Sequence, residues 1–475
     1  MSAILPKWRL VLGYALATIA LLLAIEAARC WVQNTPALAW WIFPAAQRRL
    51  ATVVGFAALA SALAVTALSA TPRRVPSWLL FLYVFALALT NGRYIGSGDC
   101  EPTRLLPFIA LRQHQLTFEG AIAAQDLAKE YVVAGARIAS KYPIATALLA
   151  IPAYLPAALG SYSPASEMPF ELERIAAAML AAFSLCLLRP VFRRFTASDT
   201  SALWVCGAYG FGTAFLTILS KALWQHTGAA FGLSLAMFGL FAAPKRASGV
   251  WVGIGAGLAL ACRPVDVILS AGVLLALFWI DKRQAVVAAL LTFACALLVA
   301  LYNLSIFGSV TSSGYGTEAG AFTASFVTGF AGLLISPARG LLLYTPCLAL
   351  AALALVRADG MQVVTRTLLG ACALFVMVMA KWWCWWGGYS PDSRMVCDTL
   401  PLLSVGLALA WTSTPRVWLL AACTWGVALH VLQAYVGGNA YVRALFWAML
   451  EGPWDPRSFA PVTYVLGIFL HYPAS

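Results

Sequence analysis

The chain has 475 residues, of which 62% are hydrophobic and only 10% are charged, and its formal net charge is +13. Soluble globular domains carry about a quarter charged residues, so this composition excludes an ordinary soluble protein and indicates a polytopic α-helical membrane protein. The basic residues stand in twos and threes between apolar runs rather than in one stripe, a pattern of membrane topology that argues against nucleic acid as a partner.

Apolar runs divide the chain into about 13 expected membrane-spanning helices within a single domain, residues 1–475. The first run follows Lys7 and Arg9 and is longer than the apolar part of a signal peptide, so we assign it to a helix with a cytoplasmic N-terminus. Almost every basic cluster then falls on the cytoplasmic side, with Arg48 and Arg49 as the exceptions. The expected spans are residues 10–28, 50–70, 77–90, 174–188, 202–219, 228–243, 250–262, 265–280, 285–307, 341–356, 367–380, a run that ends before residue 416, and 418–435.

The longest polar interval, residues 91–143, follows the third of these spans. It carries two carboxylates, Asp99 and Glu101, soon after the apolar segment ends. Taking a carboxylate out of water is costly unless it meets a cation, a proton or a substrate. We therefore expect this interval to form an outer catalytic loop with juxtamembrane helices.

Residues 144–160 are apolar but contain Pro152 and Pro156. If this run crossed the membrane, the basic cluster that begins at Arg189 would lie outside, against the positive-inside tendency. We therefore expect an interfacial or re-entrant segment, since proline-broken helices are tolerated where they pack on protein. The tail, residues 437–475, is expected to be outer or interfacial, and whether its short apolar run spans the membrane stays open.

Several cations reach the expected outer side, where they are candidates to bind an anion such as a lipid phosphate. The four candidates are Lys141, Arg263, Arg339 and Arg394. For each, the alternative is a side chain that extends to the lipid headgroups. Asp266, three residues after Arg263, either neutralises that arginine or takes part in substrate binding.

Residues 381–396 form an aromatic loop on the same expected side. Its four tryptophans, Trp386 among them, fit either an interfacial aromatic belt or a surface that stacks on a sugar. The pair Gly387–Gly388 permits a tight turn that would bring Asp392 and Arg394 back toward the site.

The chain has 11 cysteines, most of which lie inside apolar runs where they behave as small hydrophobic residues. Their spacing shows no zinc motif. Cys384 and Cys397 flank a polar loop and would be able to pair if that loop faces an oxidising compartment.

Short motifs follow one another in a set order between residues 90 and 402. They are the acidic pair Asp99 and Glu101, Lys141-Tyr142-Pro143, Trp224-Gln225-His226, Gly257 with Arg263-Pro264, Phe307-Gly308-Ser309 with Gly314-Tyr315, Ser336-Pro337 with Arg339-Gly340-Leu341, and Trp382 and Trp385 with Gly387-Gly388. In this order and on this side they resemble the GT-C superfamily of integral membrane glycosyltransferases, which use polyprenyl-phosphate-linked sugars, as aminoarabinose and mannosyl transferases do. The acidic pair here follows a third helix, where the family usually has it after the first, so two helices have been added at the front.

The resemblance implies a GT-C-like fold and a mechanism. A sugar on a polyprenyl phosphate already has a leaving group, so the enzyme needs a base for the acceptor and positive charge for the departing phosphate. By resemblance Asp99 is the base for in-line attack with inversion, and Glu101 assists it or binds a divalent cation with it; no other cofactor is implied. From the residues alone, Asp99 also fits a helix cap and Glu101 a first-turn acid.

Eight residues are candidates to bind the donor or acceptor. They are Lys141, Tyr142, His226, Arg263, Arg339, Trp386, Asp392 and Arg394. For His226, beside Trp224, the alternative is a helix-end histidine whose hydrogen bonds are satisfied within the protein.

These features predict a glycosyltransferase that moves a sugar from a polyprenyl-phosphate donor to a hydroxyl of a glycan, lipid or protein acceptor. We expect it in the bilayer of a bacterial inner membrane, with its active site on the extracytoplasmic face. A lipid-linked glycan polymerase or ligase is the nearest alternative, although such proteins usually depend on arginine and histidine in a large late outer loop. A transporter or flippase would place ionisable groups near the bilayer midplane and often shows an internal repeat, whereas these charges collect at one face.

Overall fold

The computed structural model describes residues 7–33, 50–69, 75–90, 97–122, 128–158, 160, 168–388, 390, 392–436, 452–459 and 461–462. Most of this part is helical, and seven of its helices are long and apolar enough to cross a membrane. Five shorter apolar helices accompany them. The expected all-α polytopic fold is confirmed, while the total of about 13 spans stays a prediction. The expectations for Arg48, Arg49 and most of the tail fall outside the described residues.

The helices follow in chain order with one small sheet between them. They are α1 (Lys7–Gln33), α2 (Leu50–Leu68), α3 (Ser77–Leu89), α4 (Glu101–Gln113), α5 (Ala145–Ala158), α6 (Met168–Phe195), α7 (Asp199–Phe211), α8 (Gln225–Phe241), α9 (Ser248–Cys262), α10 (Val267–Ile280), α11 (Lys282–Phe307), α12 (Phe326–Ile335), α13 (Leu341–Tyr344), α14 (Cys347–Arg357), α15 (Gln362–Ala380), α16 (Leu400–Ser413) and α17 (Arg416–Val431). An antiparallel hairpin, β1 (Tyr131–Ala134) and β2 (Arg137–Ser140), follows α4.

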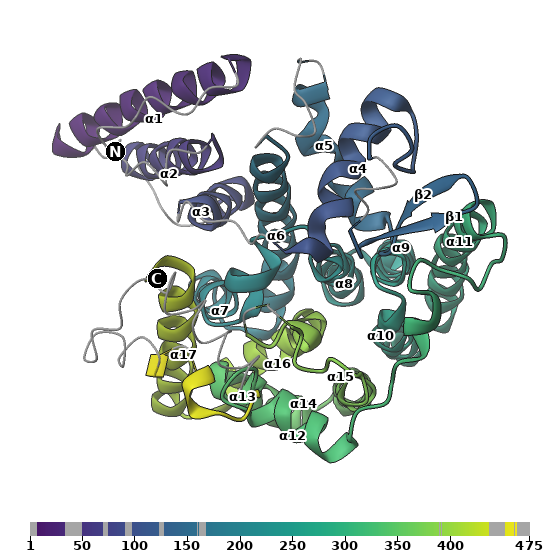
Figure 1. Ribbon diagram of the computed structural model, residues 1–475. Helices are drawn as coiled ribbons and strands as arrows, with labels where there is room; N and C mark the ends of the chain where they lie inside the picture. The colour runs from purple at the N-terminus through teal and green to yellow at the C-terminus, as the bar shows by residue number, and fades with distance from the viewer. Residues whose placement is uncertain are drawn as a thin grey trace.

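In Figure 1, α1, α2 and α3 lie side by side along one edge of the molecule, α11 lies at another edge, and α8 lies near the centre. The largest apolar core joins side chains of α6, α7, α8, α15 and α16. By contrast, only 17% of the apolar window of α1 or of α11 is buried, and Leu290, Phe293 and Leu298 of α11 are exposed. Large apolar side chains on an outer helix face are what a helix surrounded by lipid requires.

The packing of α8 on α9 depends on glycine. A Cβ added to Gly232 would lie 2.7 Å from both the amide nitrogen of Ala259 and the carbonyl oxygen of Gly255. Small residues at such a crossing let two helix backbones approach closely, which is how membrane helices gain packing contacts. This close packing holds the beginning of α8, with its Trp-Gln-His motif, at a defined place in the bundle.

The first turns of α6 carry buried charges that connect several helix ends. Glu173 accepts a hydrogen bond from Arg104 of α4 at 3.0 Å and another from the backbone N–H of Leu223 at 3.1 Å. Arg174 donates to the carbonyl oxygen of Leu89, the last residue of α3, at 2.8 Å. Glu171 accepts from the N–H of Ala51, near the start of α2, at 2.9 Å. The end of α3 and the starts of α2, α4 and α6 therefore meet at one end of the bundle.

Because these charges are paired, α6 extends further than its apolar run. The sequence predicts a span of residues 174–188, whereas α6 begins at Met168 and ends at Phe195.

Two other expected spans are broken. Residues 202–219 divide into α7 and a π-helical turn, Phe215–Leu219, and residues 341–356 divide into α13 and α14, because Pro346 cannot donate the hydrogen bond that a continuous helix needs.

Both ends of α5 lie near the ends of other helices. Thr146, at its start, lies against Gly228 in the first turn of α8, and Ala157, near its end, shares an apolar cluster with Met168 at the start of α6. Tyr154 of α5 also packs edge-on against Phe108 of α4 at 5.2 Å. The interfacial or re-entrant assignment of residues 144–160 stays a prediction.

Candidate functional site

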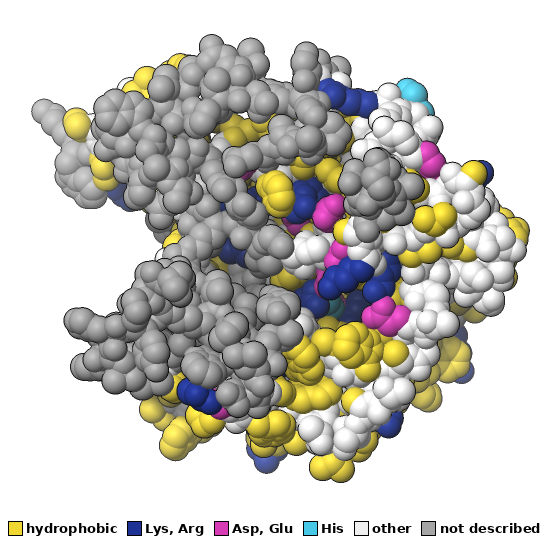
Figure 2. Space-filling model, viewed as in Figure 1, with side chains coloured by type: hydrophobic (Ala, Val, Ile, Leu, Met, Phe, Trp, Pro, Cys, Tyr) yellow, Lys and Arg dark blue, Asp and Glu magenta, His cyan; other side chains and the backbone are white. Residues whose placement is uncertain are grey.

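Acidic and basic side chains gather in a hollow on one face of the molecule. Figure 2 shows Lys, Arg, Asp and Glu side chains together near the centre of this face, with apolar side chains around them. Asp99, Lys141 and Arg394 keep part of their side chains exposed, at 32%, 17% and 12%. We take this group of partly exposed charges as the candidate active site.

Asp99 lies in a short turn, Gly98–Cys100, directly before α4. Its Oδ1 accepts a hydrogen bond from the Tyr142 hydroxyl at 2.7 Å, and its Oδ2 accepts one from Nη1 of Arg394 at 2.7 Å. The residue in the cap position of α4 is Cys100 rather than Asp99. The helix-cap interpretation of Asp99 is therefore wrong, and the carboxylate is instead held by a phenol and a guanidinium.

These partners determine the protonation of Asp99. Burial alone would raise the pKa of this carboxyl, but the charge of Arg394 and the hydrogen bonds from Arg394 and Tyr142 outweigh burial, so the pKa lies below its ordinary value. Burial and the neighbouring Asp99 charge together raise the pKa of the Tyr142 phenol. Asp99 is therefore ionised at neutral pH, and Tyr142 is protonated and able to donate.

The hairpin β1–β2 brings Tyr142 to this place. Its tip contains Gly135 in the left-handed region, with a φ of +62° that favours glycine. Just after β2, the N–H of Lys141 donates to the carbonyl oxygen of Glu130 at 2.9 Å, which extends the ladder to the residue before Tyr142. Sequence reasoning missed this hairpin because its strands have only four residues each.

Arg394 comes from the other end of the chain. Gly387 and Gly388 have φ values of +75° and +61°, so the expected tight turn is present, and Nη2 of Arg394 donates back to the carbonyl oxygen of Gly387 at 3.0 Å. The guanidinium lies over the ring of Trp224, with 4.8 Å between its carbon and the ring centroid. The sequence predicted that this turn brings Asp392 and Arg394 back toward the site, and of the two Arg394 contacts Asp99.

A second group of charges lies deeper, where α8, α9 and α16 begin or end. Nδ1 of His226 lies 2.9 Å from Oδ2 of Asp398, and Arg263 forms an ion pair with the same carboxylate. Asp266 lies 3.9 Å from Arg263. His226 and Arg263 are each 6% exposed and Asp398 is fully buried. In this structure Arg263 is thus paired within the protein, and His226 is a helix-end histidine with a protein partner.

Asp398 belongs to the one group of possible metal ligands found among the described residues. Ligand atoms of His226, Cys397 and Asp398 lie within 4.8 Å of one another. The guanidinium of Arg263 already contacts Asp398, and its positive charge opposes a metal ion at this place. For the pair predicted to share a divalent cation, Asp99 is engaged as described above and Glu101 accepts from the Tyr131 hydroxyl at 3.0 Å. A bound cation there stays a prediction.

Arg339 donates hydrogen bonds to the backbone of the aromatic loop. It is 3% exposed, and its Nε and Nη2 donate to the carbonyl oxygens of Trp386 and Gly388 at 2.6 and 2.8 Å. Its contacts therefore hold the turn that precedes Arg394.

Cys384 and Cys397, considered above as a possible pair, are free thiols.

Asp392 is buried beside α17. It is 1% exposed, has a φ of +55°, and its Oδ2 lies 2.8 Å from Nδ1 of His430 and accepts from the Thr217 hydroxyl at 3.0 Å. Nε2 of His430 lies 3.1 Å from the Thr345 hydroxyl. The order resembles a nucleophile, a histidine and an acid, but Thr345 and His430 are fully buried. A substrate would not reach them, so Asp392 anchors the loop in this structure.

We expect Asp392→Ala to lower the free energy of unfolding by about 2 kcal/mol or more, because it leaves the buried imidazole of His430 without its acceptor. Asp392→Asn should cost less, since an amide oxygen can still accept and asparagine tolerates the left-handed backbone. Thermal unfolding of both purified variants in detergent measures the difference. Equal destabilisation by alanine and asparagine would contradict the anchoring role.

Sequence reasoning missed several residues of these networks, because their partners are distant in the chain. Tyr315 exchanges hydrogen bonds of 2.7 and 3.0 Å with Gln225, and its ring lies edge-on to Tyr142 at 5.8 Å. Glu318 forms an ion pair with Lys141. Tyr315 and Gln225 both belong to the motifs quoted from the sequence, but only Tyr142 was given a role there.

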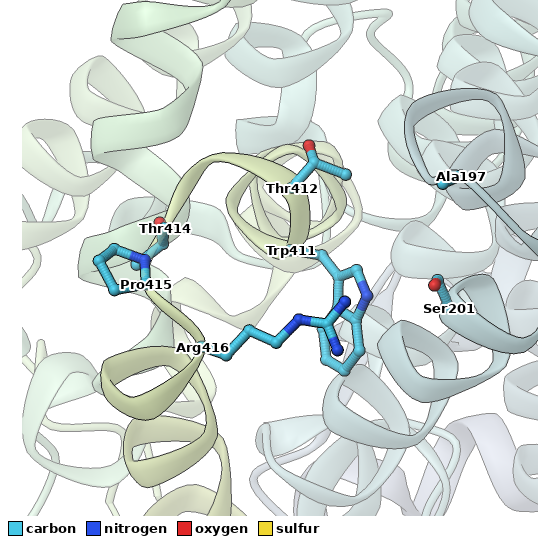
Figure 3. Close-up of a pocket in the computed structure, with 7 residues that line it drawn as sticks. All are labelled: Ala197, Ser201, Trp411, Thr412, Thr414, Pro415 and Arg416. Carbon is cyan, nitrogen blue, oxygen red and sulfur yellow. The ribbon is translucent and has the colours of Figure 1, made fainter.

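A separate cavity lies away from this site. Figure 3 shows it where α16 ends and α17 begins, opposite the start of α7. Its volume is about 400 Å³, and its lining includes Trp411, Arg416 and Ser201. Arg416 lies over the ring of Trp411 at 6.0 Å. None of the candidate site residues lines this cavity.

The fold and the site together define an integral membrane protein that carries a partly exposed acid and cations at one end of its helical bundle. No protein-family model matches the chain, and no curated protein matches it. Among solved structures, the chain is similar to the crystal structure of ArnT from Cupriavidus metallidurans bound to undecaprenyl phosphate. The match covers 83% of this chain and 74% of that chain, with a TM-score of 0.48 and 14% sequence identity. At these values the likeness assigns neither a substrate nor a role to any residue.

Proposed function

We propose that this protein is a membrane glycosyltransferase that moves a sugar from a polyprenyl-phosphate donor to an acceptor hydroxyl, with inversion at the anomeric carbon. The observation that carries the proposal is the contact of Asp99 with Arg394 and Tyr142, with Nζ of Lys141 5.8 Å from the centre of the Tyr142 ring. The motif order between residues 90 and 402, which resembles the GT-C superfamily, agrees with it.

The residues fit the roles that this reaction needs. Asp99 is the base that takes the proton of the acceptor hydroxyl, since its pKa lies below the ordinary value and the carboxylate is exposed in part. Lys141 and Arg394 supply positive charge for the departing phosphate. Tyr142 orients Asp99 by its hydrogen bond at 2.7 Å. Arg263 and Arg339 contribute behind these residues, through Asp398 and the aromatic loop.

The positions of the buried charges favour this proposal over a transporter. Glu173 and Arg174 lie in the first turns of α6, Arg263 lies between α9 and α10, and Asp398 lies just before α16. They therefore gather at helix ends, whereas a transporter needs ionisable groups near the bilayer midplane. An enzyme that works at the membrane surface needs ionisable groups at the ends of its helices.

A donor panel tests the proposal. Purified protein in lipid nanodiscs is incubated with radiolabelled sugars carried either by polyprenyl phosphate or by a nucleoside diphosphate, together with an extract of bacterial membranes as acceptor. We expect label to move to the extract only from a polyprenyl-phosphate donor. The absence of transfer from every such donor, or equal transfer from the nucleotide donor, would contradict the proposed function.

We also expect the site to face the extracytoplasmic side, since Lys245, Arg246 and similar clusters lie at the other helix ends. Two cysteine variants at exposed positions test this, Gln115→Cys in the expected outer loop, residues 91–143, and Lys245→Cys after α8. A membrane-impermeant maleimide applied to intact cells should label the first and not the second, with the unsubstituted protein as background. The reverse pattern would place the site in the cytoplasm.

A further inference from the structure

The segment between α11 and α12 contacts Lys141 and Tyr142 of the candidate site. We call residues 308–320 the strap. A Cβ on Gly314 would lie 2.5 Å from the carbonyl oxygens of Ser140 and Lys141, so only glycine lets the strap lie this close to the chain after β2. One residue further, Tyr315 packs on Tyr142 and bonds to Gln225. The strap is therefore built onto the hollow.

Near its end, the strap places a carboxylate on one of the cations of the hollow. Glu318 forms an ion pair with Lys141, and the two side chains are 30% and 17% exposed. Its other oxygen lies 3.4 Å from Nε1 of Trp383, in the aromatic loop. The backbone reinforces this arrangement, because the N–H of Trp383 donates to the carbonyl oxygen of Ala321 at 2.9 Å. Glu318 thus connects the outer catalytic loop to the aromatic loop.

The two cations of the hollow are therefore each neutralised by a carboxylate, but the two carboxylates are held differently. Asp99 has two short contacts of 2.7 Å, to Arg394 and Tyr142. Glu318 has Lys141 and one long contact to an indole. A phosphate that enters the hollow must replace one of these acids, since two anions on one cation repel each other. Glu318 is the acid held by fewer short contacts, and its removal leaves the base in place.

We propose that Glu318 competes with the donor for Lys141: it occupies the place of the lipid phosphate, lowers the affinity of the site for phosphorylated lipids and is displaced when such a lipid binds. This inference rests on the proposed function, in which Lys141 binds the donor phosphate. An uncharged prenol cannot replace the carboxylate, because its arrival would leave Lys141 unpaired in a partly buried place. The strap thus acts on the binding of phosphorylated lipids and not of neutral ones, through a competing contact in the protein itself.

The test compares two lipids and four variants, which are Glu318→Gln, Lys141→Met, their combination and a control. Binding of radiolabelled decaprenyl phosphate and of decaprenol to protein in nanodiscs is measured by scintillation proximity. Glu318→Gln should bind decaprenyl phosphate about 2- to 5-fold more tightly than the wild type, the range that a partly exposed ion pair contributes. Binding of decaprenol should not change, because decaprenol does not displace the carboxylate, so the preference for the phosphate over the alcohol should widen. In the double variant with Lys141→Met, the tighter phosphate binding should disappear.

The matched control is Glu119→Gln, which changes the net charge equally. Glu119 accepts a hydrogen bond from the N–H of Ile138 in β2 at 3.2 Å. Unchanged binding in this control would exclude a general effect of charge. If Glu318→Gln does not fold, Glu318→Asp takes its place, because its shorter side chain withdraws from Lys141. A gain of about twofold is then expected.

The outcomes separate the two proposals. Equal or weaker phosphate binding by Glu318→Gln, or an equal gain in the control, overturns the role of Glu318. If the wild type binds decaprenyl phosphate no better than decaprenol, and Lys141→Met does not change this, then the proposed phosphate site fails and with it the proposed function. Tight phosphate binding that depends on Lys141 but not on Glu318 removes only the inference about the strap.

Discussion

The Asp99→Asn variant is expected to lower the kcat of sugar transfer about 100- to 10,000-fold, the contribution of a well-placed general base. Asparagine has nearly the same shape as aspartate, and its amide oxygen can still accept from Arg394 or Tyr142. The fold should therefore persist while the group that takes the proton is lost. The KM for the donor should change little, because the cations that bind the phosphate remain. Steady-state kinetics with a polyprenyl-phosphate sugar and purified acceptor measure both constants.

Glu101→Gln provides the matched comparison. Glu101 follows Asp99 by two residues and accepts from Tyr131 at the start of the hairpin, so it lies in the same loop with a different partner. We expect it to lower kcat less than about tenfold. A large loss in Glu101→Gln together with near-normal kcat in Asp99→Asn would show that the base had been assigned to the wrong carboxylate.

Arg394→Gln is expected to lower kcat/KM about 100-fold or more and to change its dependence on pH. Activity requires the carboxylate form of Asp99, so it is present above the pKa of Asp99 and is lost as the pH falls through that pKa. In the wild type, Arg394 keeps this pKa below its ordinary value. Without the guanidinium, burial remains and raises the pKa. The acid limb of the kcat/KM profile should therefore move to higher pH.

Arg394→Lys separates charge from geometry. A lysine keeps a positive charge near Asp99, so the acid limb should move less than with glutamine. It cannot reproduce the planar contact with Trp224 or the bond to Gly387, so kcat/KM should still fall. An acid limb that stays in place in both variants would mean that another group determines the protonation of the base.

The parts of this site that can be predicted from the sequence are those that depend on residues close together in the chain. Asp99 and Arg394 were both predicted, since each is a polar residue at the edge of an apolar run and Gly387–Gly388 indicates a turn. Their direct contact was not predictable from local pattern, because 295 positions separate them. The same holds for Asp398, which stands within an apolar stretch and gains meaning only from His226 and Arg263.

Periodicity also explains the errors in the fold. An apolar run predicts that a segment is buried, but not whether it is continuous. Residues 341–356 were therefore expected as one span, although Pro346 divides them. In the opposite direction, α12 was missed because the segment before Arg339 was assigned as a whole to a polar loop. Arg339 and Asp392 were predicted to bind substrate because they are charged and lie in expected outer loops. In the structure, Arg339 donates to backbone carbonyl groups and Asp392 pairs with buried His430.

The distance in sequence between Asp99 and Arg394 has a consequence for biosynthesis. A ribosome delivers the first carboxylate to the membrane long before the guanidinium that charges it. Until Arg394 has been delivered, the nascent chain has an acid without its cation. On the proposed function, transfer would begin only when the late helices dock onto the early ones, and a prematurely ended chain would be inactive.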